Sequence, residues 1–190
     1  MVDISGVMPK SIGKGQLMES FRIDSGAERS YMIHVEEVTQ ITDQLVRTLV
    51  EIDLQTFSES TFSNYTARLF LASGRVFLLK AEDTIIGTCV CTRAWERPNE
   101  ATLVSMGIRP GWRGRGLGHR FLDGISQRLT QKGVRAINLL VSRDNRRALR
   151  IYDDKGFRIT QEMDPDMRTG EVFLLMRKPL EVVSPVKPIS

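Results

Sequence analysis

The stretch Ile108-Arg-Pro-Gly-Trp-Arg-Gly-Arg-Gly-Leu-Gly-His-Arg120 joins an apolar run, 101–108, to an amphipathic run, 117–132. This pattern predicts a strand that ends in a turn rich in glycine and arginine, and a helix that begins directly after the turn. Glycines let several main-chain N–H groups converge there, and the first turn of the helix adds unpaired donors and its dipole. Such a concave surface binds an anion, most naturally a phosphate or diphosphate. The sequence therefore predicts a phosphate-binding turn.

Outward from this turn, the hydrophobic residues alternate between the spacing of strands and that of helices. A strongly apolar segment follows the helix after the turn, which indicates a parallel crossover. The sequence therefore predicts a mixed α/β sheet with this crossover in its middle. The expected strands are 30–35, 75–80, 84–95, 101–108, 135–141, 157–162 and 170–177, and the expected helices are 41–52, 64–72, 117–132 and 145–155.

The size and composition of the chain are those of one globular domain. Its 190 residues suffice for a sizeable core, and 41% of them are hydrophobic and 26% charged. No run approaches the roughly 20 apolar residues of a membrane span, and the first residues lack the apolar region of a signal peptide. These features predict a cytoplasmic protein. Local composition predicts a flexible arm at 1–27, a folded domain at 28–180 and a flexible tail at 181–190.

The charges and the cysteines argue against other classes of site. A net charge of +4 is too small to indicate nucleic-acid binding, although arginines cluster at the glycine turn and again at 143–150. A metal site needs several ligands, and the chain has only two histidines and two cysteines. Cys89 and Cys91 lie two apart on an expected strand, where a disulfide is geometrically poor. We therefore expect no metal, and two reduced, buried thiols.

Three kinds of glycine turn bind phosphate groups, and two of them fit this sequence poorly. A P-loop needs Lys-Ser or Lys-Thr directly after a glycine, and no glycine of this chain is followed by either pair. A dinucleotide fold places its glycines after the first strand, with an acid about 20 residues later. Here several strands precede the turn. The third kind fits: Arg113-Gly-Arg-Gly-Leu-Gly118 resembles the R/Q-x-x-G-x-G/A pattern of the GNAT superfamily of acyl-CoA-dependent N-acyltransferases.

A second segment carries the same resemblance. Asn145 to Phe157 is similar to the N-x-x-A-x-x-x-Y-x-x-x-G-F pattern of that family, with Ala148, Tyr152 and Gly156 in register. The resemblance covers roughly 31–180. It implies the GNAT fold, a single α/β domain with a mixed, mostly antiparallel sheet of about seven strands. The parallel crossover lies at its centre and four helices flank it.

The resemblance implies acetyl-CoA as the cosubstrate. In the family, the diphosphate lies on the glycine turn, and the pantetheine arm lies along the preceding strand where two strands separate. Main-chain donors of the turn would hold the diphosphate, and the two arginines of the turn would add positive charge. Asn145 would hydrogen-bond the pantetheine arm, or would act only as a helix cap. The implied coenzyme-binding residues are Met106, Gly107, Ile108, Arg113, Gly114, Arg115, Gly116, Leu117, Gly118 and Asn145.

Tyr152 is the catalytic residue that the resemblance implies. It would act as a general acid that donates a proton to the departing sulfur of the coenzyme. A phenol with a pKa of about 10 protonates a thiolate with a pKa of about 8.5 only near balance, so proximity matters more than acidity. The alternative is an aromatic core residue. Glu96, Glu100 and Asp144 are available carboxylates, and the sequence assigns none of them as the general base.

The resemblance implies an amine acceptor that is selected by the segments 52–62 and 161–170. The pattern of Asp53, Phe57 and Ser58 is similar to enzymes that acetylate protein N-termini, but that group usually carries Glu where Leu140 stands. A peptide N-terminus and a small-molecule amine therefore remain equal alternatives.

Two functions other than acetyl transfer also remain open. One is a non-catalytic domain that binds acyl-CoA as a sensor or structural partner. The other is a basic nucleic-acid module, which would need aromatic residues between the arginines, and Trp112 alone is thin support. We expect no nucleic-acid or membrane partner, and leave a homodimer open.

Overall fold

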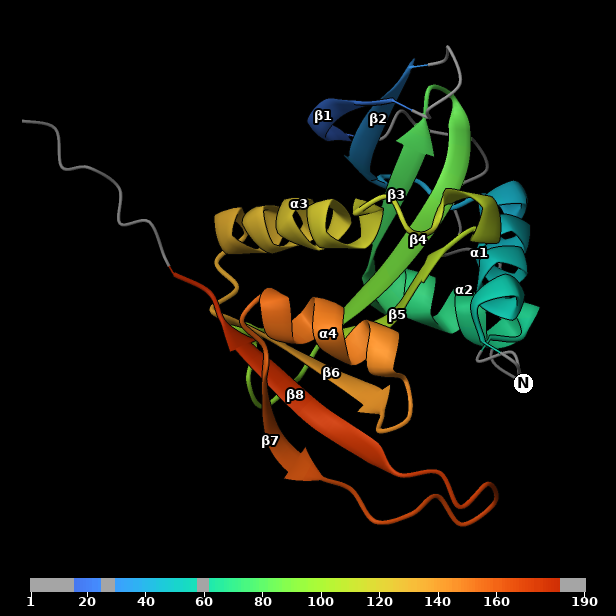
Figure 1. The fold of residues 1–190 in the computed structure, drawn as a ribbon. Coiled ribbons are helices and arrows are strands. Elements are labelled where there is room, and N and C mark those ends of the chain that lie inside the picture. The colour runs from blue at the N-terminus through green and yellow to red at the C-terminus, as the bar shows by residue number, and fades with distance from the viewer. Residues whose placement is uncertain (1–15, 25–29, 58–61, 182–190) are drawn as a thin grey trace, which may run out of the picture.

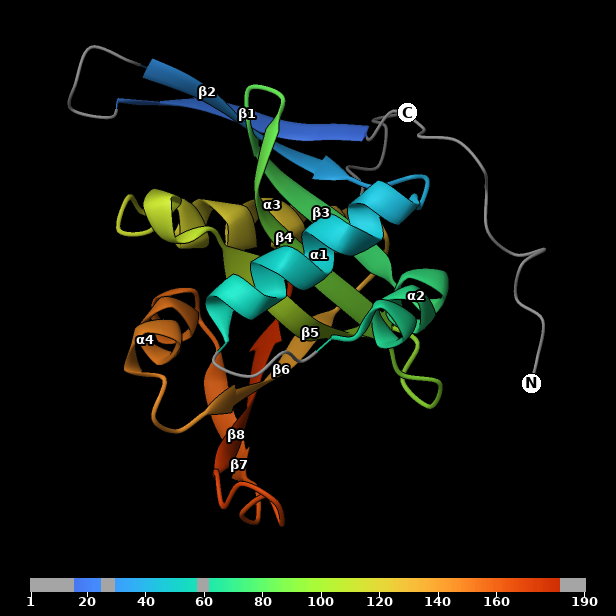
Figure 2. The same cartoon turned by 90° about the vertical axis from the view of Figure 1, so that its right-hand side faces the viewer.

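A computed structural model describes residues 16–24, 30–57 and 62–181. Figure 1 shows a central sheet with α3 and α4 on one face and α1 and α2 on the other, and Figure 2 shows the second face directly. The sheet has eight strands in the order β1-β2-β3-β4-β5-β6-β8-β7. The elements are β1 Gln16–Asp24, β2 Ser30–Glu37, α1 Asp43–Thr56, α2 Asn64–Ser73, β3 Arg75–Ala81, β4 Thr84–Arg93, β5 Glu100–Ile108, a 3-10 turn Pro110–Trp112, α3 Leu117–Gln131, β6 Ala136–Ser142, α4 Arg146–Asp154, β7 Arg158–Glu162 and β8 Phe173–Pro179.

The predicted α/β architecture is confirmed. Only β5 and β6 pair in parallel, through the crossover helix α3, and the other strand pairs of the described sheet are antiparallel. The last strand, β8, lies between β6 and β7, so the terminal hairpin joins the sheet through its second strand.

The expectation of a flexible arm at 1–27 is wrong for residues 16–24. These residues form β1, which pairs antiparallel with β2 and brings the sheet to eight strands. Phe21 and Ile23 turn toward the core under α3, while Arg22 between them is exposed. Burial of this apolar face accounts for the order of the segment. The other residues of the expected arm, and the expected tail beyond 181, lie outside the described residues.

The core consists of two hydrophobic clusters, one on each face of the sheet. The larger cluster lies under α3 and α4 and includes Phe121, Ile125 and Phe157, all with no exposed surface. The smaller cluster lies under α1 and α2 and includes Leu49 and Leu71. Each helix thus buries one apolar stripe against the sheet, as the sequence periodicity predicts.

A β-bulge interrupts β5 in its middle. Leu103 pairs with Cys91 and Ser105 pairs with Val90, and these two partners are adjacent in β4. Val104 is therefore an extra residue in β5 with no partner in β4. A bulge bends its strand and reverses the alternation of side chains beyond it. Ser105 accordingly points toward α1, where its hydroxyl donates to a carboxylate of that helix, rather than toward α3.

The bulge coincides with the point where β5 and β6 separate. Their parallel pairing ends at Leu103 with Leu139, and Figure 1 shows β6 turning away beyond it. From 104 to 108, the edge of β5 that faces β6 has no strand partner in the described sheet. Main-chain groups on such an edge are free to pair with an extended ligand.

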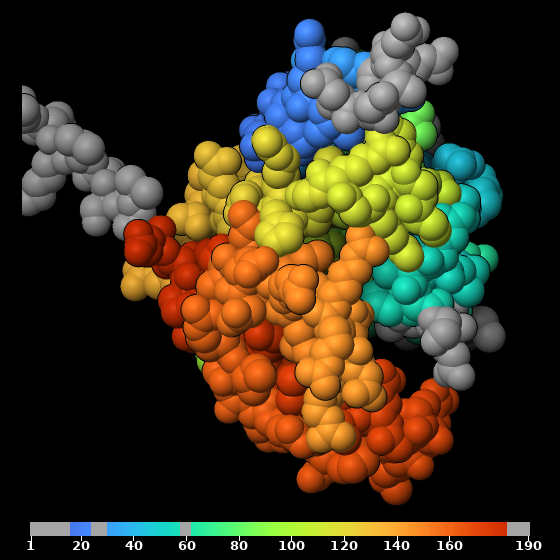
Figure 3. Space-filling view, in the orientation of Figure 1, coloured from blue at the N-terminus to red at the C-terminus, as the bar shows by residue number. Residues whose placement is uncertain are grey.

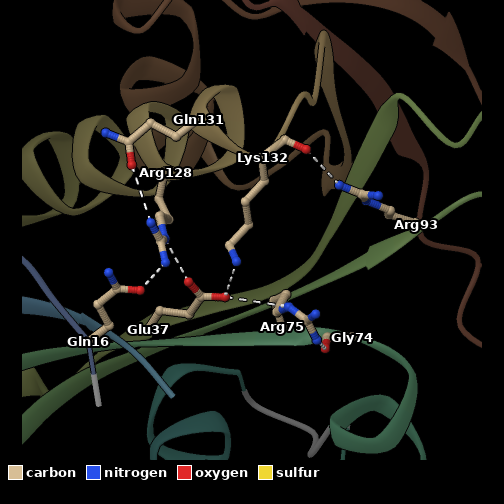
Figure 4. Close-up of polar contacts among 8 residues, drawn as sticks. All are labelled: Gln16, Glu37, Gly74, Arg75, Arg93, Arg128, Gln131 and Lys132. Carbon is tan, nitrogen blue, oxygen red and sulfur yellow. Dashed lines mark hydrogen bonds and ion pairs between the residues drawn. The ribbon is translucent and has the colours of Figure 1, made fainter. Parts of the chain in front are cut away.

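The carboxylate of Glu37 joins the far end of α3 to the sheet (Figure 4). It is 5% exposed and accepts from Arg128 Nε at 2.7 Å, while Lys132 Nζ lies at 3.1 Å and Arg75 Nε at 3.4 Å. Burial alone would raise the pKa of Glu37, but hydrogen bonds from Arg128 and Lys132 outweigh it and lower the pKa. This carboxylate therefore stabilises the fold above pH about 4.5 and loses the effect as pH falls through the lowered pKa.

Replacing Glu37 with Gln is expected to lower the free energy of unfolding by roughly 3 kcal/mol, because it leaves three cations around a neutral amide. The control is Glu162→Gln, since Glu162 pairs with Arg143 through side chains that are 57% and 52% exposed. That change should cost less than about 1 kcal/mol. Urea denaturation of both variants measures the difference, and equal losses would show that Glu37 has no special role in stability.

None of the helices in the described ranges is long and apolar enough to span a membrane.

Candidate functional site

The glycine turn lies between β5 and α3, and two of its glycines adopt the left-handed conformation. Gly114 has φ +83° and Gly116, the N-cap of α3, has φ +71°. A Cβ built on either glycine would meet no atom within 4 Å. Both glycines therefore border open space, which any side chain there would fill.

Five consecutive main-chain donors at this turn lack an acceptor. No group in the described part of the chain accepts a hydrogen bond from the N–H groups of residues 114–118. Leu117 is 2% exposed, so its side chain anchors the start of α3 in the core. Free N–H groups at a helix N-terminus attract anions, and the open space beside the two glycines fits a diphosphate.

The other two glycines of the implied site permit close packing. A Cβ on Gly107 would lie 2.6 Å from Thr56 Oγ1, so the end of α1 rests directly on β5. A Cβ on Gly118 would lie 3.2 Å from Ile151 Cδ1, so α3 and α4 approach closely at the turn. Met106 and Ile108, on the opposite face from Gly107, pack their side chains against the larger core cluster.

The side chains of the two arginines in the turn bind the protein itself. Arg113 Nε donates to the carbonyl of Ile108 at 2.7 Å, and its Nη2 donates to the carbonyl of Gln55 at 2.8 Å. Arg115 Nη2 donates to the carbonyl of Gly111 at 3.3 Å, and its guanidinium lies 5.2 Å from the ring centroid of Trp112. Arg113 therefore links the end of β5 to the end of α1, a contact that its place in the motif does not predict.

Partial burial lowers the pKa of Arg113, and the nearby positive charge of Arg147 lowers it further. The start of α4 thus adds a cation beside the turn. Figure 3 shows the surface hollowed between the yellow residues that precede α3 and the orange residues that precede α4. Positive charge on both sides of this hollow favours an anionic ligand.

Asn145 caps α4, as the sequence predicts. Its Oδ1 accepts from the N–H of Ala148 at 3.1 Å. The side-chain amide N–H₂ donates to no group in the described ranges, so the cap leaves this donor available. The contact of Asn145 with a pantetheine arm remains a prediction.

Tyr152 lies on α4 with its ring turned into the sheet. It is 7% exposed, and its ring centroid lies 5.5 Å from that of Phe157. No residue in the described part of the chain hydrogen-bonds its hydroxyl. Burial, and then the nearby Cys89 and Cys91, raise its pKa well above the ordinary value. Since Cys89 pairs with Met106 of β5, the ring lies on the same face of the sheet as this part of β5.

The two cysteines are reduced and buried, as expected. Cys89 is 0% and Cys91 2% exposed, and their Sγ atoms are 3.8 Å apart. Burial raises the pKa of Cys89, and the hydrogen bond with Cys91 adds to this. The Cys89 thiol is therefore a poor nucleophile, and burial shields both thiols from reagents.

A maleimide is expected to label neither cysteine in the native protein and both after denaturation, because both thiols are buried in the native fold. Mass spectrometry of the labelled protein counts the modified thiols. Fast labelling of the native protein would show that the strands around the thiols open readily.

The carboxylates of Glu100 and Asp53 are already bound. Glu100 accepts from Asn138 at 2.8 Å and from Arg177 at 3.0 Å, and these hydrogen bonds lower its pKa. Asp53, 2% exposed, accepts from the Ser105 hydroxyl at 3.1 Å and from the N–H of Phe62 at 3.2 Å. The first is a poor base, and the second joins α1 to the bulge of β5.

A separate hollow of about 230 Å³ lies away from this turn. Acids dominate its lining, with Glu36 bound to Lys80 at 3.2 Å and Glu82 accepting from the N–H of Met32 at 2.8 Å. Such a lining repels a diphosphate. Among the described residues, no three His, Cys, Asp or Glu side chains lie close enough to share a metal ion.

The family model for the GNAT acetyltransferases matches residues 40–157 of this chain. This range contains both the glycine turn and the helix that carries Tyr152. No curated protein matches the chain.

Solved structures share the fold at low sequence identity. The ribosomal-protein-S18-alanine N-acetyltransferase of Escherichia coli is 18% identical with a TM-score of 0.68, over 84% of this chain and 99% of that one. Ard1 of Thermoplasma volcanium is 17% identical with a TM-score of 0.66, over 78% and 98%. The yncA protein of Salmonella typhimurium, solved with its cofactor acetyl-CoA, is 14% identical with a TM-score of 0.62, over 82% and 98%. Because the family model covers more than half of it, the chain belongs to the GNAT family of acetyl-CoA-dependent N-acetyltransferases.

Proposed function

We propose that this protein transfers an acetyl group from acetyl-CoA to a primary amine by direct attack, with Tyr152 as the proton donor to the leaving sulfur. The observation that carries the proposal is the run of five free N–H groups at 114–118, beside two glycines that leave space for a diphosphate. This run lies next to the unpaired edge of β5. Together they offer one continuous path for an extended phosphate-bearing ligand.

The main chain does most of the binding in this proposal. The N–H groups of 114–118 hold the diphosphate, and the helix dipole of α3 adds to the attraction. The edge of β5 at 106–108 pairs with the amides of the pantetheine arm, in the manner of an added strand. The free amide of Asn145 contacts the same arm. Residues 106–108 thus hold the thioester where the two strands separate.

The reaction forms one bond and breaks another. The amine nitrogen attacks the thioester carbonyl carbon, the C–N bond forms, the C–S bond breaks, and the coenzyme leaves as a thiol. The nitrogen loses one proton and the sulfur gains one. A main-chain N–H near Met106–Ile108 stabilises the charge that develops on the carbonyl oxygen.

The burial of Tyr152 sharpens its proposed role. Its raised pKa keeps the phenol protonated at working pH, so a donor is always present. Complete proton transfer to a thiolate with a pKa of about 8.5 is uphill for such a phenol. The hydroxyl therefore acts mainly by donating a hydrogen bond to the sulfur as the C–S bond lengthens. Its proton then passes to the sulfur as the phenolate recovers one from the positively charged nitrogen of the intermediate, which leaves a neutral amide and a free thiol.

The amine must reach the site in its neutral form. Near neutral pH, deprotonation costs under roughly 1 kcal/mol for a peptide N-terminus with a pKa of about 7.7–8.0, and about 4 kcal/mol for a lysine with a pKa of about 10.4. With Glu100 already paired, an acceptor of low amine pKa needs the least help. Peptide N-termini and small amines of low pKa both satisfy this condition.

A non-catalytic acyl-CoA sensor is the alternative. It would bind acetyl-CoA at the same turn but would have no use for an unpaired hydroxyl on the largely buried side chain of Tyr152. The retained Tyr152 therefore favours the enzyme.

The test is a screen for acetyl-CoA-dependent release of free thiol with peptides, polyamines, aminoglycosides and amino acids as acceptors. The proposal predicts thiol release with at least one class, and acetylated product by mass spectrometry. Tight acetyl-CoA binding without turnover on any class would support the sensor instead.

A further inference from the structure

Two arginines, one just before the glycine turn and one within it, are bound to the last two turns of α1. Arg109 makes a two-pronged contact with Glu51, with Nη1–Oε1 at 2.6 Å and Nη2–Oε2 at 3.2 Å. Arg113 reaches further along the helix, to the carbonyl of Gln55 at 2.8 Å and to Thr56 Oγ1 at 3.3 Å. Figure 3 shows the yellow-green residues before α3 lying against the teal residues of α1.

Arg113 bonds two elements with one planar group. Its Nε holds the carbonyl of Ile108, the last residue of β5, while its Nη2 holds the carbonyl of Gln55 at the end of α1. A guanidinium presents its donors in a rigid fork, which fixes the two carbonyls relative to each other. The positive charge also suits the C-terminus of a helix, where unpaired carbonyls gather. Without these two acceptors, partial burial of the cation would be unfavourable.

The end of α1 lies where an acceptor must pass. Thr56 contacts β5 at Gly107, on the face opposite Met106 and Ile108. A coenzyme on the glycine turn enters between α3 and α4, on the side of Met106 and Ile108. An amine that attacks the thioester from the other side therefore passes the end of α1.

We propose that Arg113 is a positioning residue that couples coenzyme binding at the glycine turn to the order of the C-terminal end of α1, and that it does not contact the diphosphate. The inference rests on the proposed function, because it takes acetyl-CoA as the ligand of the turn. A ligand that fixes 106–108 and the glycine turn also fixes the main chain of Arg113 and the Ile108 carbonyl that its side chain binds. The guanidinium then restrains the Gln55 carbonyl at the end of α1. The result is an acceptor-side helix end that becomes more ordered when the coenzyme binds.

Hydrogen exchange of the amides at 53–57, with and without acetyl-CoA, measures the coupling. In the wild type, acetyl-CoA is expected to slow this exchange by at least about fivefold. Arg113→Lys keeps the charge but lacks the fork, so both it and Arg113→Gln should lose the slowing. Arg93→Gln is the matched control, since Arg93 also donates to a carbonyl at the end of a helix, that of Lys132 at 3.1 Å, but at the far end of α3 from the turn. This control should keep the effect.

Calorimetry with acetyl-CoA separates positioning from phosphate binding. The proposal predicts equal coenzyme affinity for Arg113→Lys and Arg113→Gln. The proposal is overturned if Arg113→Lys binds acetyl-CoA clearly more tightly than Arg113→Gln while both variants keep the wild-type exchange at 53–57. Arg113 would then be a phosphate ligand.

Failure of the coupling can be told apart from failure of the function. If the wild type binds acetyl-CoA and exchange at 53–57 does not change, the coupling is wrong and the proposed function stands. If the wild type does not bind acetyl-CoA, both are wrong. In the coenzyme-free protein, faster exchange at 53–57 in Arg113→Gln than in Arg93→Gln would independently support the link that Arg113 makes between β5 and α1, and equal rates would contradict it.

Discussion

Replacing Gly116 with glutamate is expected to weaken acetyl-CoA binding by at least about 100-fold, or roughly 3 kcal/mol. The added side chain occupies the open space beside the free N–H groups, and its carboxylate faces the diphosphate. Two like charges about 4 Å apart near a protein surface repel by about 4 kcal/mol, so this loss is a conservative expectation. Isothermal titration calorimetry with acetyl-CoA measures it.

The chain offers a closely matched control at the other end of the same helix. Gly133 follows α3, has φ +79°, and has no atom within 4 Å of a built Cβ. Gly133→Glu therefore introduces the same left-handed strain and the same charge, but far from the turn. Its coenzyme affinity should stay close to that of the wild type. Equal affinity in the two glutamate variants would contradict a diphosphate site at Gly116.

Replacing Tyr152 with phenylalanine is expected to lower kcat by about 100-fold while the Kd for acetyl-CoA changes little. The ring and its packing on Phe157 are kept, so only the hydroxyl is lost. The matched control is Tyr31→Phe, since the ring of Tyr31 stacks edge-on against Trp112 at 5.0 Å. That variant should turn over at the wild-type rate. An unchanged kcat in Tyr152→Phe would remove Tyr152 from the mechanism.

The pH dependence gives a second measurement on the same residue. A proton donor loses activity as pH rises through its pKa, and the raised pKa of Tyr152 moves that loss upward. We therefore expect kcat to hold through pH about 10, where an ordinary phenol would be half ionised. The tyrosinate absorbance of the wild type, minus that of Tyr152→Phe, should likewise show no ionisation of Tyr152 below that pH. A decline of kcat centred below pH about 10 that vanishes in the phenylalanine variant would contradict the burial effect.

The parts of the fold that depend on local sequence could be predicted. Gly114, Gly116 and Gly133 all have positive φ, and Asn145 caps its helix, because glycine freedom and side-chain capping are local properties. The apolar periodicity of 117–132 likewise identified α3. The terminal hairpin was predicted as two strands, but the insertion of β8 between β6 and β7 was not, since periodicity carries no information on which strand pairs with which.

The strand β1 had a signal that composition concealed. Phe21 and Ile23 alternate with Ser20, Arg22 and Asp24, which is the spacing of a half-buried strand. The glycines, serines and lysines before them made the whole segment resemble a flexible arm.

The features that shape the site depend on tertiary packing. The bulge at Val104 is visible only when β4 and β5 are aligned, and nothing in the local sequence marks it. The motif places Arg113 at the coenzyme-binding turn but carries no sign that its side chain reaches Gln55, 58 residues away in the chain. The link between Asp53 and Ser105 spans 52 residues. Contacts of this kind follow from how α1 lies across the sheet.

A crystal structure of the protein with acetyl-CoA tests the central claim most directly. We predict that the diphosphate oxygens lie within hydrogen-bonding distance of the main-chain nitrogens of 114–118, with the pantetheine arm along β5 beyond Leu103 and the sulfur beside Tyr152. Coenzyme bound at another surface, or a glycine turn that stays empty at saturating acetyl-CoA, would contradict it.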